Sequence, residues 1–347
     1  MAKFMRKVPP RSHAAFDHGG DLSAARKAYP QAPEPWLDLS TGVSPYAYPF
    51  APLPPGSWTR LPQSDELLKL EAAARLAYRV PPLAEIVAAP GSQAVINWLP
   101  HLYRVHRAGI LGRTYSEHVR SWSAAGAVVT VVEDVKELET QDVAAVVNPN
   151  NPDGRLLPVE ALIRLARTLG ARGGLVVVDE AFADFFSPAA SVLPAFPEEG
   201  LVVLRSFGKA YGLPGLRLGF AIAPKSIAEK LRHALDPWPV SSAAIAIGSV
   251  ALADRTWVEL TRAQLAAQGE ALDRLLAAAG FEIVGATPLF RLVRHEDAQG
   301  VFHQLASAGI LARRFPERAD WLRFSIPASK TELDRLGRIL LHISSVR

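Results

Sequence analysis

Seven short apolar runs alternate with helical or loop-like segments in the first two thirds of the chain. They lie at 86–89, 108–111, 128–132, 143–147, 175–178, 201–204 and 218–222. Each run is apolar at successive positions, which is typical of strands covered on both faces. Alternation of such strands with helices predicts an α/β domain built on a mostly parallel sheet.

The pattern differs on either side of this region. Residues 1–62 are rich in proline and glycine and lack periodicity, which favours an extended arm. A helical stripe begins after Ser64, where Asp65 and Glu66 supply an acidic first turn. Residues 241–279 are expected to be helical throughout. A smaller α+β unit follows, with strands expected at 281–284, 289–293, 310–313 and 321–326 and helices near 298–308 and 330–343.

These patterns divide the chain into three parts. We expect an N-terminal arm at 1–62 that packs partly with the small domain. A large domain should occupy 63–236, and a small C-terminal domain 237–347.

The amino-acid composition excludes several classes of protein and of chemistry. The 347 residues are 49% hydrophobic and 21% charged, which excludes wholesale disorder. Cysteine is absent, so disulfides, thiolate zinc sites and a cysteine nucleophile are excluded, and a reducing, cytoplasmic setting fits. The net charge is only +4, and the seven tryptophans are dispersed without a basic stripe, so no nucleic-acid partner is expected.

The sequence also predicts no membrane span, no secretory signal and no metal site. The longest apolar run, 243–253, is too short to span a bilayer, and no apolar stretch follows the basic N-terminus, so neither a membrane span nor a secretory signal is predicted. The nine histidines form no helical pair with metal-ligand spacing, so no metal site is predicted.

The segment 204–220 carries the first chemical signal. Lys209 follows an apolar run and small residues, and Arg217 comes eight positions later. Lysine can lose its proton and form a Schiff base, whereas arginine cannot. A surface lysine in a turn is the ordinary alternative.

Polar side chains also follow two other apolar runs. Asp179 ends the run at 175–178, and the segment 148–154, with Asn151, directly follows the run at 143–147. Ligands of α/β sheets bind at the carboxyl ends of the strands. An aspartate there can pair with a pyridinium nitrogen, although caps and turns use the same residues.

A phosphate cradle is a further candidate. Ser92 and Gln93 follow a Pro-Gly turn between a predicted strand and a predicted helix, where backbone amides can bind phosphate. Tyr115, just past another strand, can stack on an aromatic ring or simply pack.

Taken in order, these segments resemble the fold-type I enzymes that depend on pyridoxal 5'-phosphate (PLP), the aspartate aminotransferase superfamily. Within it they are similar to the class of histidinol-phosphate aminotransferases and threonine-phosphate decarboxylases. The resemblance implies that Lys209 forms the Schiff base with PLP, that Asp179 pairs with the pyridine nitrogen, and that Asn151 bonds the phenolic oxygen. It also implies ring stacking by Tyr115. The implied phosphate ligands are Ser92, Gln93, Ser206 and Arg217.

Three details resemble the decarboxylase branch. They are His18-Gly19-Gly20 followed by Asp21, Phe182 in Asp-Glu-Ala-Phe where aminotransferases usually have tyrosine, and the run 204–219. The resemblance implies decarboxylation of L-threonine O-3-phosphate to (R)-1-amino-2-propanol O-2-phosphate, which supplies the nucleotide-loop linker of cobalamin. A class I/II aminotransferase such as histidinol-phosphate aminotransferase needs the same pocket and remains the alternative, as does a relative without catalysis.

The resemblance also suggests how substrate is held and where this chain departs. Arg323 and Arg313 are candidates for binding the two anionic ends of a substrate, with His18 and Gly19 reaching them if the arm folds over the site. A homodimer is implied, with the loop near 60–61 crossing to the partner. Gly208, Leu61 and Gly42 stand where many relatives have hydroxyl, tyrosine and asparagine side chains, which leaves details of the phosphate and substrate contacts open.

Overall fold

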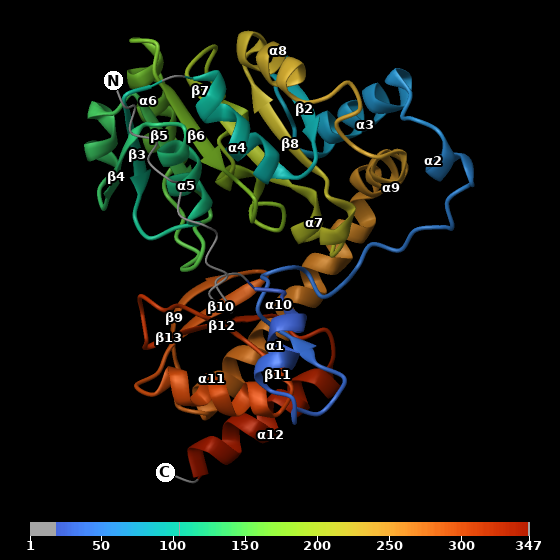
Figure 1. The fold of residues 1–347 in the computed structure, drawn as a ribbon, viewed down its shortest axis with the longest axis vertical. Helices are drawn as coiled ribbons and strands as arrows, with labels where there is room; N and C mark the ends of the chain where they lie inside the picture. Colours follow the sequence, from blue (N-terminus) through green and yellow to red (C-terminus); the bar gives the residue numbers. More distant parts are fainter. Residues whose placement is uncertain (1–18, 104, 346–347) are drawn as a thin grey trace, which may run out of the picture.

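The computed structural model describes residues 19–103 and 105–345, and a seven-stranded sheet forms the centre of its larger unit (Figure 1). Its strands are β2 (Glu85–Ala89), β3 (Arg107–Leu111), β4 (Val128–Val132), β5 (Val143–Val147), β6 (Leu175–Asp179), β7 (Leu201–Ser206) and β8 (Gly219–Ala223). All seven apolar runs therefore form strands. The strand order is β2-β8-β7-β6-β5-β3-β4, so the chain crosses the sheet repeatedly.

The sheet is mostly parallel, as expected. Strands β7, β6, β5, β3 and β4 pair in parallel, whereas β8 runs antiparallel to both of its neighbours, β2 and β7. Because neighbouring parallel strands end at one edge, the polar residues that follow β5, β6 and β7 come together.

Helices cover both faces of this sheet. Alternate strand residues pack on one side with α4 (Ser92–Leu102), α5 (Glu117–Ala124) and α8 (Lys225–Ala234). The other residues pack with α3 (Ser64–Ala77), α6 (Val159–Gly170) and α9 (Ser242–Ala253). This double cover explains why the strands are apolar at successive positions.

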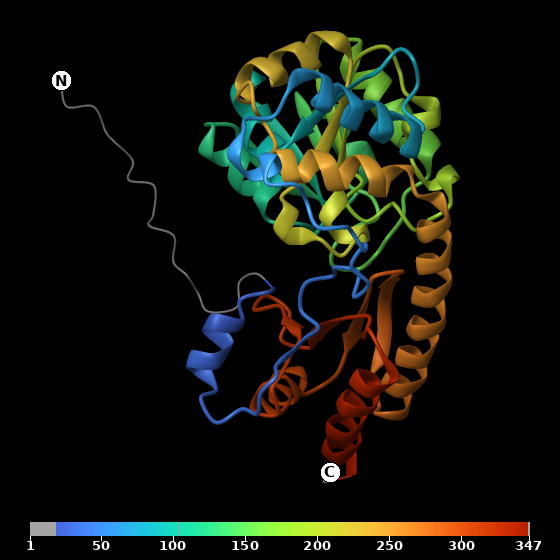
Figure 2. The ribbon, with the colours of Figure 1, turned by 90° about the vertical axis from the view of Figure 1, so that its right-hand side faces the viewer.

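The smaller unit is built on a four-stranded antiparallel sheet in the order β12-β13-β10-β9. Its strands are β9 (Glu282–Thr287), β10 (Phe290–Arg294), β12 (Arg313–Arg314) and β13 (Trp321–Ser325). Helices α11 (Ala298–Ser307) and α12 (Lys330–Ser345) pack within it. Figure 2 shows the long helix α10 (Arg255–Ala278) running along one side from the larger unit to the smaller one.

Three predicted elements differ in the structure. The helix expected over 241–279 is divided at Asp254, which ends α9 and caps α10 by accepting a hydrogen bond from the Trp257 amide. The strand expected at 310–313 splits into β11 (Ile310–Leu311) and β12, which belong to different sheets. The aperiodic arm contains two short helices, α1 (Leu22–Ala28) and α2 (Gly56–Thr59), and α1 is capped by the Asp21 side chain.

The arm connects the two units at the edge of the sheet where β6 and β7 end. Strand β1 (Leu37–Asp38) pairs in parallel with β11, and the Ser325 amide donates to the Leu39 carbonyl. A few residues later, the Ser44 amide donates to the Lys209 carbonyl over 2.7 Å. We call residues 39–48 the strap, because it bonds to the small sheet at one end and to the segment around Lys209 at the other.

No helix among residues 19–103 and 105–345 is both long and apolar enough to cross a membrane.

Candidate active site

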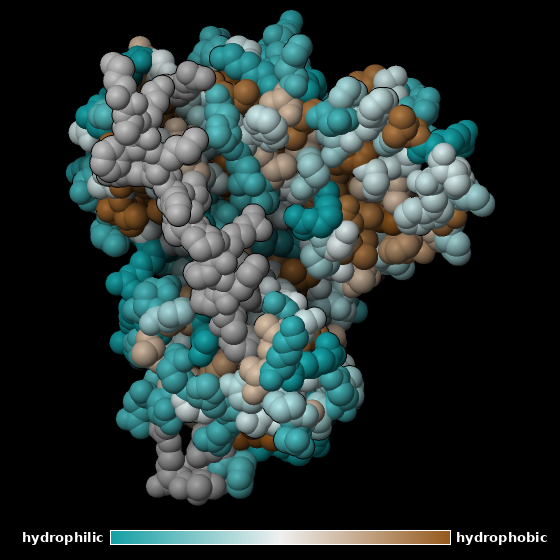
Figure 3. Space-filling model, viewed as in Figure 1, coloured by the Kyte–Doolittle hydropathy of each residue, from teal (hydrophilic) through white to brown (hydrophobic). Residues whose placement is uncertain are grey.

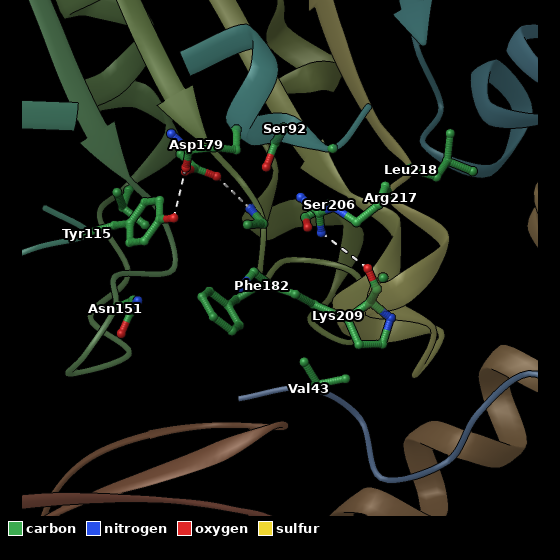
Figure 4. Close-up of a pocket in the computed structure, with 16 residues that line it drawn as sticks. Val43, Ser92, Tyr115, Asn151, Asp179, Phe182, Ser206, Lys209, Arg217 and Leu218 are labelled. Carbon is green, nitrogen blue, oxygen red and sulfur yellow. Dashed lines mark hydrogen bonds between the residues drawn. The ribbon is translucent and has the colours of Figure 1, made fainter. Parts of the chain in front are cut away.

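One pocket gathers the polar residues that follow the parallel strands (Figure 4). Eight predicted cofactor-binding residues line it: Ser92, Gln93, Tyr115, Asn151, Asp179, Ser206, Lys209 and Arg217. They come from β6, β7, the N-terminus of α4, the short helix α7 (Phe207–Ala210) and the loops between them. Segments more than 100 residues apart in sequence thus meet in one cavity.

Lys209 lies on α7, directly after β7. Its Nζ lies 4.5 Å from the centroid of the Phe182 ring and makes no hydrogen bond within the described part of the chain. Burial, with the nearby Arg323 and Arg217 charges, lowers the pKa of the Lys209 amine to about 8, although Asp179 opposes this shift. A buried amine with a lowered pKa is the form of lysine that attacks carbonyl carbon.

Asp179 ends β6 and is 3% exposed. Its Oδ2 lies 3.1 Å from Nε2 of His118, and its Oδ1 accepts a hydrogen bond from the Ala181 amide. These contacts fix the carboxylate at the pocket wall. His118 could not be predicted as a partner of Asp179, because a lone histidine on an amphipathic helix gives no signal for such a role.

The N-terminus of α4 forms another wall. No side chain caps the N-terminus of this helix. Its first backbone N–H groups, at the end that lines the pocket, are therefore not bonded by a capping side chain. Gly91 has φ +80°, and a Cβ there would come within 3.0 Å of Nη2 of Arg217. A Cβ on Gly219 would lie 2.3 Å from the Ser92 amide nitrogen. The two glycines therefore allow the helix N-terminus, β8 and Arg217 to meet closely.

Gly219→Ala is expected to destabilise the fold by about 1–3 kcal/mol, because backbone must move to admit the methyl group. Urea denaturation measures the change in the free energy of unfolding. Gly215→Ala is the matched control, since a Cβ at Gly215 meets nothing within 4 Å. Equal stability of the two variants would contradict the close approach at Gly219.

Arg217 and Ser206 lie across the pocket from α4. Arg217 has φ +54°, a conformation that few non-glycine residues adopt, and its Nη1 donates to the Pro214 carbonyl. Ser206 ends β7 and is only partly buried. Together with the helix N-terminus they place a guanidinium, a hydroxyl and backbone N–H groups at one corner of the pocket, a set of groups that can bind an anion.

The Gln93 side chain makes contacts other than those expected of a phosphate ligand. Its Oε1 accepts a hydrogen bond of 2.8 Å from the Tyr115 hydroxyl, and its Nε2 donates to Asn97. Burial raises the pKa of Tyr115 to about 12, so the phenol stays protonated and donates. The Gln93 side chain thus holds the Tyr115 ring in place at the pocket.

Arg323 lies beside the pocket, on β13 of the small unit. Its Nη1 donates to Oδ1 of Asn151 over 2.5 Å and its Nη2 donates to the Ser40 carbonyl of the strap. The side chain is buried against the Phe290 ring. Burial and the neighbouring Arg313 lower the pKa of Arg323 to about 9, which keeps it charged at neutral pH.

Two other predicted substrate ligands, Arg313 and Gly19, do not line the pocket, and neither does Arg323. Arg313 on β12 stands opposite Arg323 in the sheet register. Gly19 packs on Ser40, where an added Cβ would lie 2.3 Å from the Ser40 carbonyl oxygen. His18 lies outside the described residues.

An apolar wall completes the pocket. Phe182 packs edge-to-face on Phe290, and Val43 of the strap and Leu218 also line the cavity. Neither residue was predicted to lie at the pocket: Val43 is an apolar residue in a loop, which carries no signal of its own, and Leu218 was predicted only as the first residue of an apolar strand.

Comparison with known proteins supports this picture. The family model described as aminotransferase class I and II matches residues 55–339. A threonine-phosphate decarboxylase of Pseudomonas aeruginosa is 39% identical over 332 residues, covering 94% of this chain and 97% of the relative. One from Sinorhizobium sp. is 38% identical, covering 90% and 94%. A histidinol-phosphate aminotransferase of Shewanella amazonensis is 31% identical, covering 77% and 80%.

Solved structures share the fold. The histidinol-phosphate aminotransferase of Sinorhizobium meliloti in complex with pyridoxal-5'-phosphate superposes with a TM-score of 0.82 at 19% identity, covering all of this chain and 99% of that one. The L-threonine-O-3-phosphate decarboxylase of Porphyromonas gingivalis gives 0.73 at 21% identity, covering 89% and 99%. By its matched length, its relatives and its fold, the chain belongs to the aminotransferase class I and II family.

Proposed function

We propose that this protein is a PLP-dependent carboxy-lyase that converts L-threonine O-3-phosphate to (R)-1-amino-2-propanol O-2-phosphate in cobalamin biosynthesis. The observation that carries this proposal is the 39% identity to a threonine-phosphate decarboxylase along 97% of that relative. The pocket supplies the matching chemistry, with a buried amine, a buried carboxylate and an anion-binding corner.

The residues present fit PLP. Lys209 Nζ, without a hydrogen-bonding partner in the described residues, faces the same cavity as the Asp179 carboxylate. We propose that Lys209 holds the aldehyde carbon, Asp179 the ring nitrogen, Asn151 the phenolic oxygen and Tyr115 the ring face. The phosphate would be held by Ser92, the backbone around Gln93, Ser206 and Arg217. When bound, PLP supplies an electron sink for the bond that is broken.

Lys209 has a second task in this proposal, which is proton transfer. An amine with a pKa near 8 is present both with and without its extra proton at neutral pH. It can therefore accept the proton released when substrate binds and return one to Cα after carbon dioxide leaves. The apolar wall of Phe182 beside Nζ limits the access of water to this amine.

Substrate orientation determines which bond breaks. Only a bond perpendicular to the cofactor ring can pass its electrons into the ring, so a decarboxylase must direct the substrate carboxylate out of that plane. We propose that Arg323 binds one anionic end of the substrate, because it is charged, buried and bonded to Asn151 at the pocket edge. Arg313, His18 and Gly19 are proposed to hold the other end.

The reaction itself tests the proposal. PLP-loaded protein is incubated with threonine phosphate and no keto acid, and carbon dioxide and the amine product are quantified. Carbon dioxide equal to the substrate consumed is the expected result. Consumption that requires 2-oxoglutarate and yields glutamate would overturn the proposal.

That second outcome would favour an aminotransferase. The 31% identity to a histidinol-phosphate aminotransferase keeps this function as the second candidate. Its substrate is also a phosphate ester with an amino group, so histidinol phosphate with 2-oxoglutarate serves as the parallel assay.

The pH dependence of Lys209 gives an independent prediction. In PLP-free protein, acylation of Lys209 by a small reagent is expected to increase with pH with a midpoint near 8, since only the unprotonated amine reacts. Peptide mass spectrometry measures the extent of labelling. Nα-acetyl-lysine, labelled in parallel, is the reference for an ordinary lysine amine, whose pKa is about 10.4. A midpoint for Lys209 equal to that of this reference would contradict the lowered pKa.

We further propose a cytoplasmic homodimer. Exposed apolar side chains gather over α2, α3 and α9, where Figure 3 shows brown surface on the side of α2. They include Trp58, Leu61, Leu68 and Val250, each 58–68% exposed. Covering such a patch with a second copy would bring the 60–61 loop to an interface. Sedimentation or light scattering measures the mass, and a monomer would contradict the proposal.

The division into an arm at 1–62, a large domain at 63–236 and a small domain at 237–347 also stays a prediction. Limited proteolysis that cuts near 62 and 236 would support these boundaries.

A further inference from the structure

The two strands that carry Asp179 and Ser206 each bring a charged residue to the opposite face of the sheet. Glu180 directly follows Asp179, the last residue of β6, and Arg205 precedes Ser206 on β7. The two strands are neighbours, and the Glu180 amide donates to the Leu204 carbonyl over 3.0 Å. Glu180 and Arg205 therefore lie side by side behind the pocket.

Their side chains form a buried ion pair. Arg205 Nε lies 3.3 Å from Oε2 of Glu180, and Nη1 lies 3.8 Å from Oδ2 of Asp184. The guanidinium carbon lies 4.7 Å from the centroid of the Tyr78 ring. Glu180 is fully buried and Arg205 is 6% exposed, so neither can exchange its partner for bulk water.

The Glu180 carboxylate is held by hydrogen bonds as well as by Arg205. Glu180 accepts hydrogen bonds of 2.7 Å from the Ser191 hydroxyl and 2.8 Å from the Val192 amide, in the loop beyond β6. Burial raises the pKa of Glu180, whereas Arg205 and these hydrogen bonds oppose the shift. Nε and Nη1 of Arg205 make no hydrogen bond within the described residues, so charge attraction is the main restraint on them.

Such a pair is costly to bury, and removing one partner leaves the other charge uncompensated. The guanidinium stays protonated, so it must remain beside its carboxylates. Glu180 and Arg205 therefore cannot separate without a large cost in free energy. Any change in the spacing of the ends of β6 and β7 would have to break this contact.

We propose that Glu180 and Arg205 are positioning residues, whose ion pair fixes the distance between Asp179 at the end of β6 and the Ser206–Lys209 segment after β7. This inference rests on the proposed function, because the two strand ends hold opposite ends of PLP there. The pair acts through its sequence neighbours and touches neither cofactor nor substrate. Its effect is to keep the carboxylate and the amine at the spacing that the cofactor requires.

The chain offers a matched control. Glu71 on α3 is also a buried glutamate paired with an arginine: it accepts hydrogen bonds from the Ala88 amide and from Arg232. Neither Glu71 nor Arg232 is next in sequence to a pocket-lining residue. Arg232 is itself exposed, so Glu71→Gln reports the cost of neutralising a buried glutamate that is paired with an arginine, without an effect on the site.

The experiment compares Glu180→Gln with Glu71→Gln. Three quantities are measured: the melting temperature, the dissociation constant for PLP, and the pH midpoint for acylation of Lys209 in PLP-free protein. Both variants should melt at lower temperature. Glu180→Gln should weaken PLP binding about 10-fold, as expected when reacting groups are misplaced by a fraction of an ångström. Its Lys209 midpoint should move away from about 8, because burial and the charges of Arg323, Asp179 and Arg217 set that value and each depends on where the amine lies.

Glu71→Gln should leave both site readouts at their wild-type values. Wild-type PLP affinity and midpoint in Glu180→Gln would overturn the inference, as would equal changes in both variants. If Glu180→Gln does not fold, Arg205→Lys provides the second variant. It keeps the charge but loses the planar fork, and a smaller change in the same direction is expected.

The two proposals fail in different ways. If the wild-type protein does not bind PLP, the proposed function fails, whereas the Lys209 midpoint in PLP-free protein still tests the ion pair. If the wild-type protein decarboxylates threonine phosphate and Glu180→Gln keeps a wild-type midpoint and affinity, only the positioning role fails.

Discussion

Replacing Lys209 with alanine is expected to reduce kcat by roughly 10⁴-fold or more, because one amine both holds the cofactor and transfers protons. The visible absorbance of lysine-bound PLP should disappear in the variant. Stopped assays of carbon dioxide release and absorbance spectroscopy measure the two effects. PLP should still bind through the other pocket residues, with lower affinity.

The control for this change is Lys225→Ala, which removes an exposed lysine at the start of α8. It should leave both activity and absorbance unchanged. A Lys209→Ala protein that kept its turnover would rule out the assignment of the amine, and with it the enzyme function proposed above.

Asp179→Asn is expected to lower kcat by about 10²- to 10³-fold, because a neutral amide cannot stabilise a protonated ring nitrogen as a carboxylate does. The amide keeps the shape of the side chain, so the melting temperature should change little compared with the loss of activity. Steady-state kinetics with threonine phosphate measures the effect. The loss should fall mainly on kcat, since the carboxylate does not touch the substrate.

Asp142→Asn is the comparison variant, since Asp142 precedes β5 at the opposite edge of the sheet. It should keep wild-type kinetics. If Asp179→Asn and Asp142→Asn lost activity equally, the role of Asp179 beside the ring nitrogen would be wrong.

The large sheet could be predicted from sequence because its strands are buried on both faces. Complete burial removes polar residues from each strand, so every strand appears as an uninterrupted apolar run. The direction of a strand cannot be predicted in this way. Strand β8 is as apolar as the strands of the parallel part of the sheet, yet it runs antiparallel to both of its neighbours, β2 and β7. The break at Asp254 was missed because the apolar positions of α9 and α10 continue across it.

The pocket could be predicted in part for a related reason. Residues that follow buried parallel strands meet at one edge of the sheet, which predicts that Asp179, Asn151 and Lys209 lie in one region. Contacts between distant elements could not be predicted in this way. The His118–Asp179 contact, the Arg323–Asn151 hydrogen bond and the Glu180–Arg205 pair depend on packing geometry that no spacing along the chain encodes.

Parts of the arm were predicted poorly because its helices are short. Helix α1 spans 7 residues and α2 spans 4, which is less than the length over which apolar periodicity becomes visible. The many prolines around these two helices also favour a non-helical prediction for this part of the chain.

The pairing of β1 with β11 has a consequence for synthesis on the ribosome. Leu37 is made well before its neighbour in the sheet, Ile310, which follows 273 residues later. Until then the strap has no small sheet to bind, and Arg323 is not yet available to Asn151. Contacts of such long sequence separation form slowly and last. A nascent chain therefore cannot assemble the complete pocket until Arg323 has been made, and a chain terminated before residue 323 should be inactive.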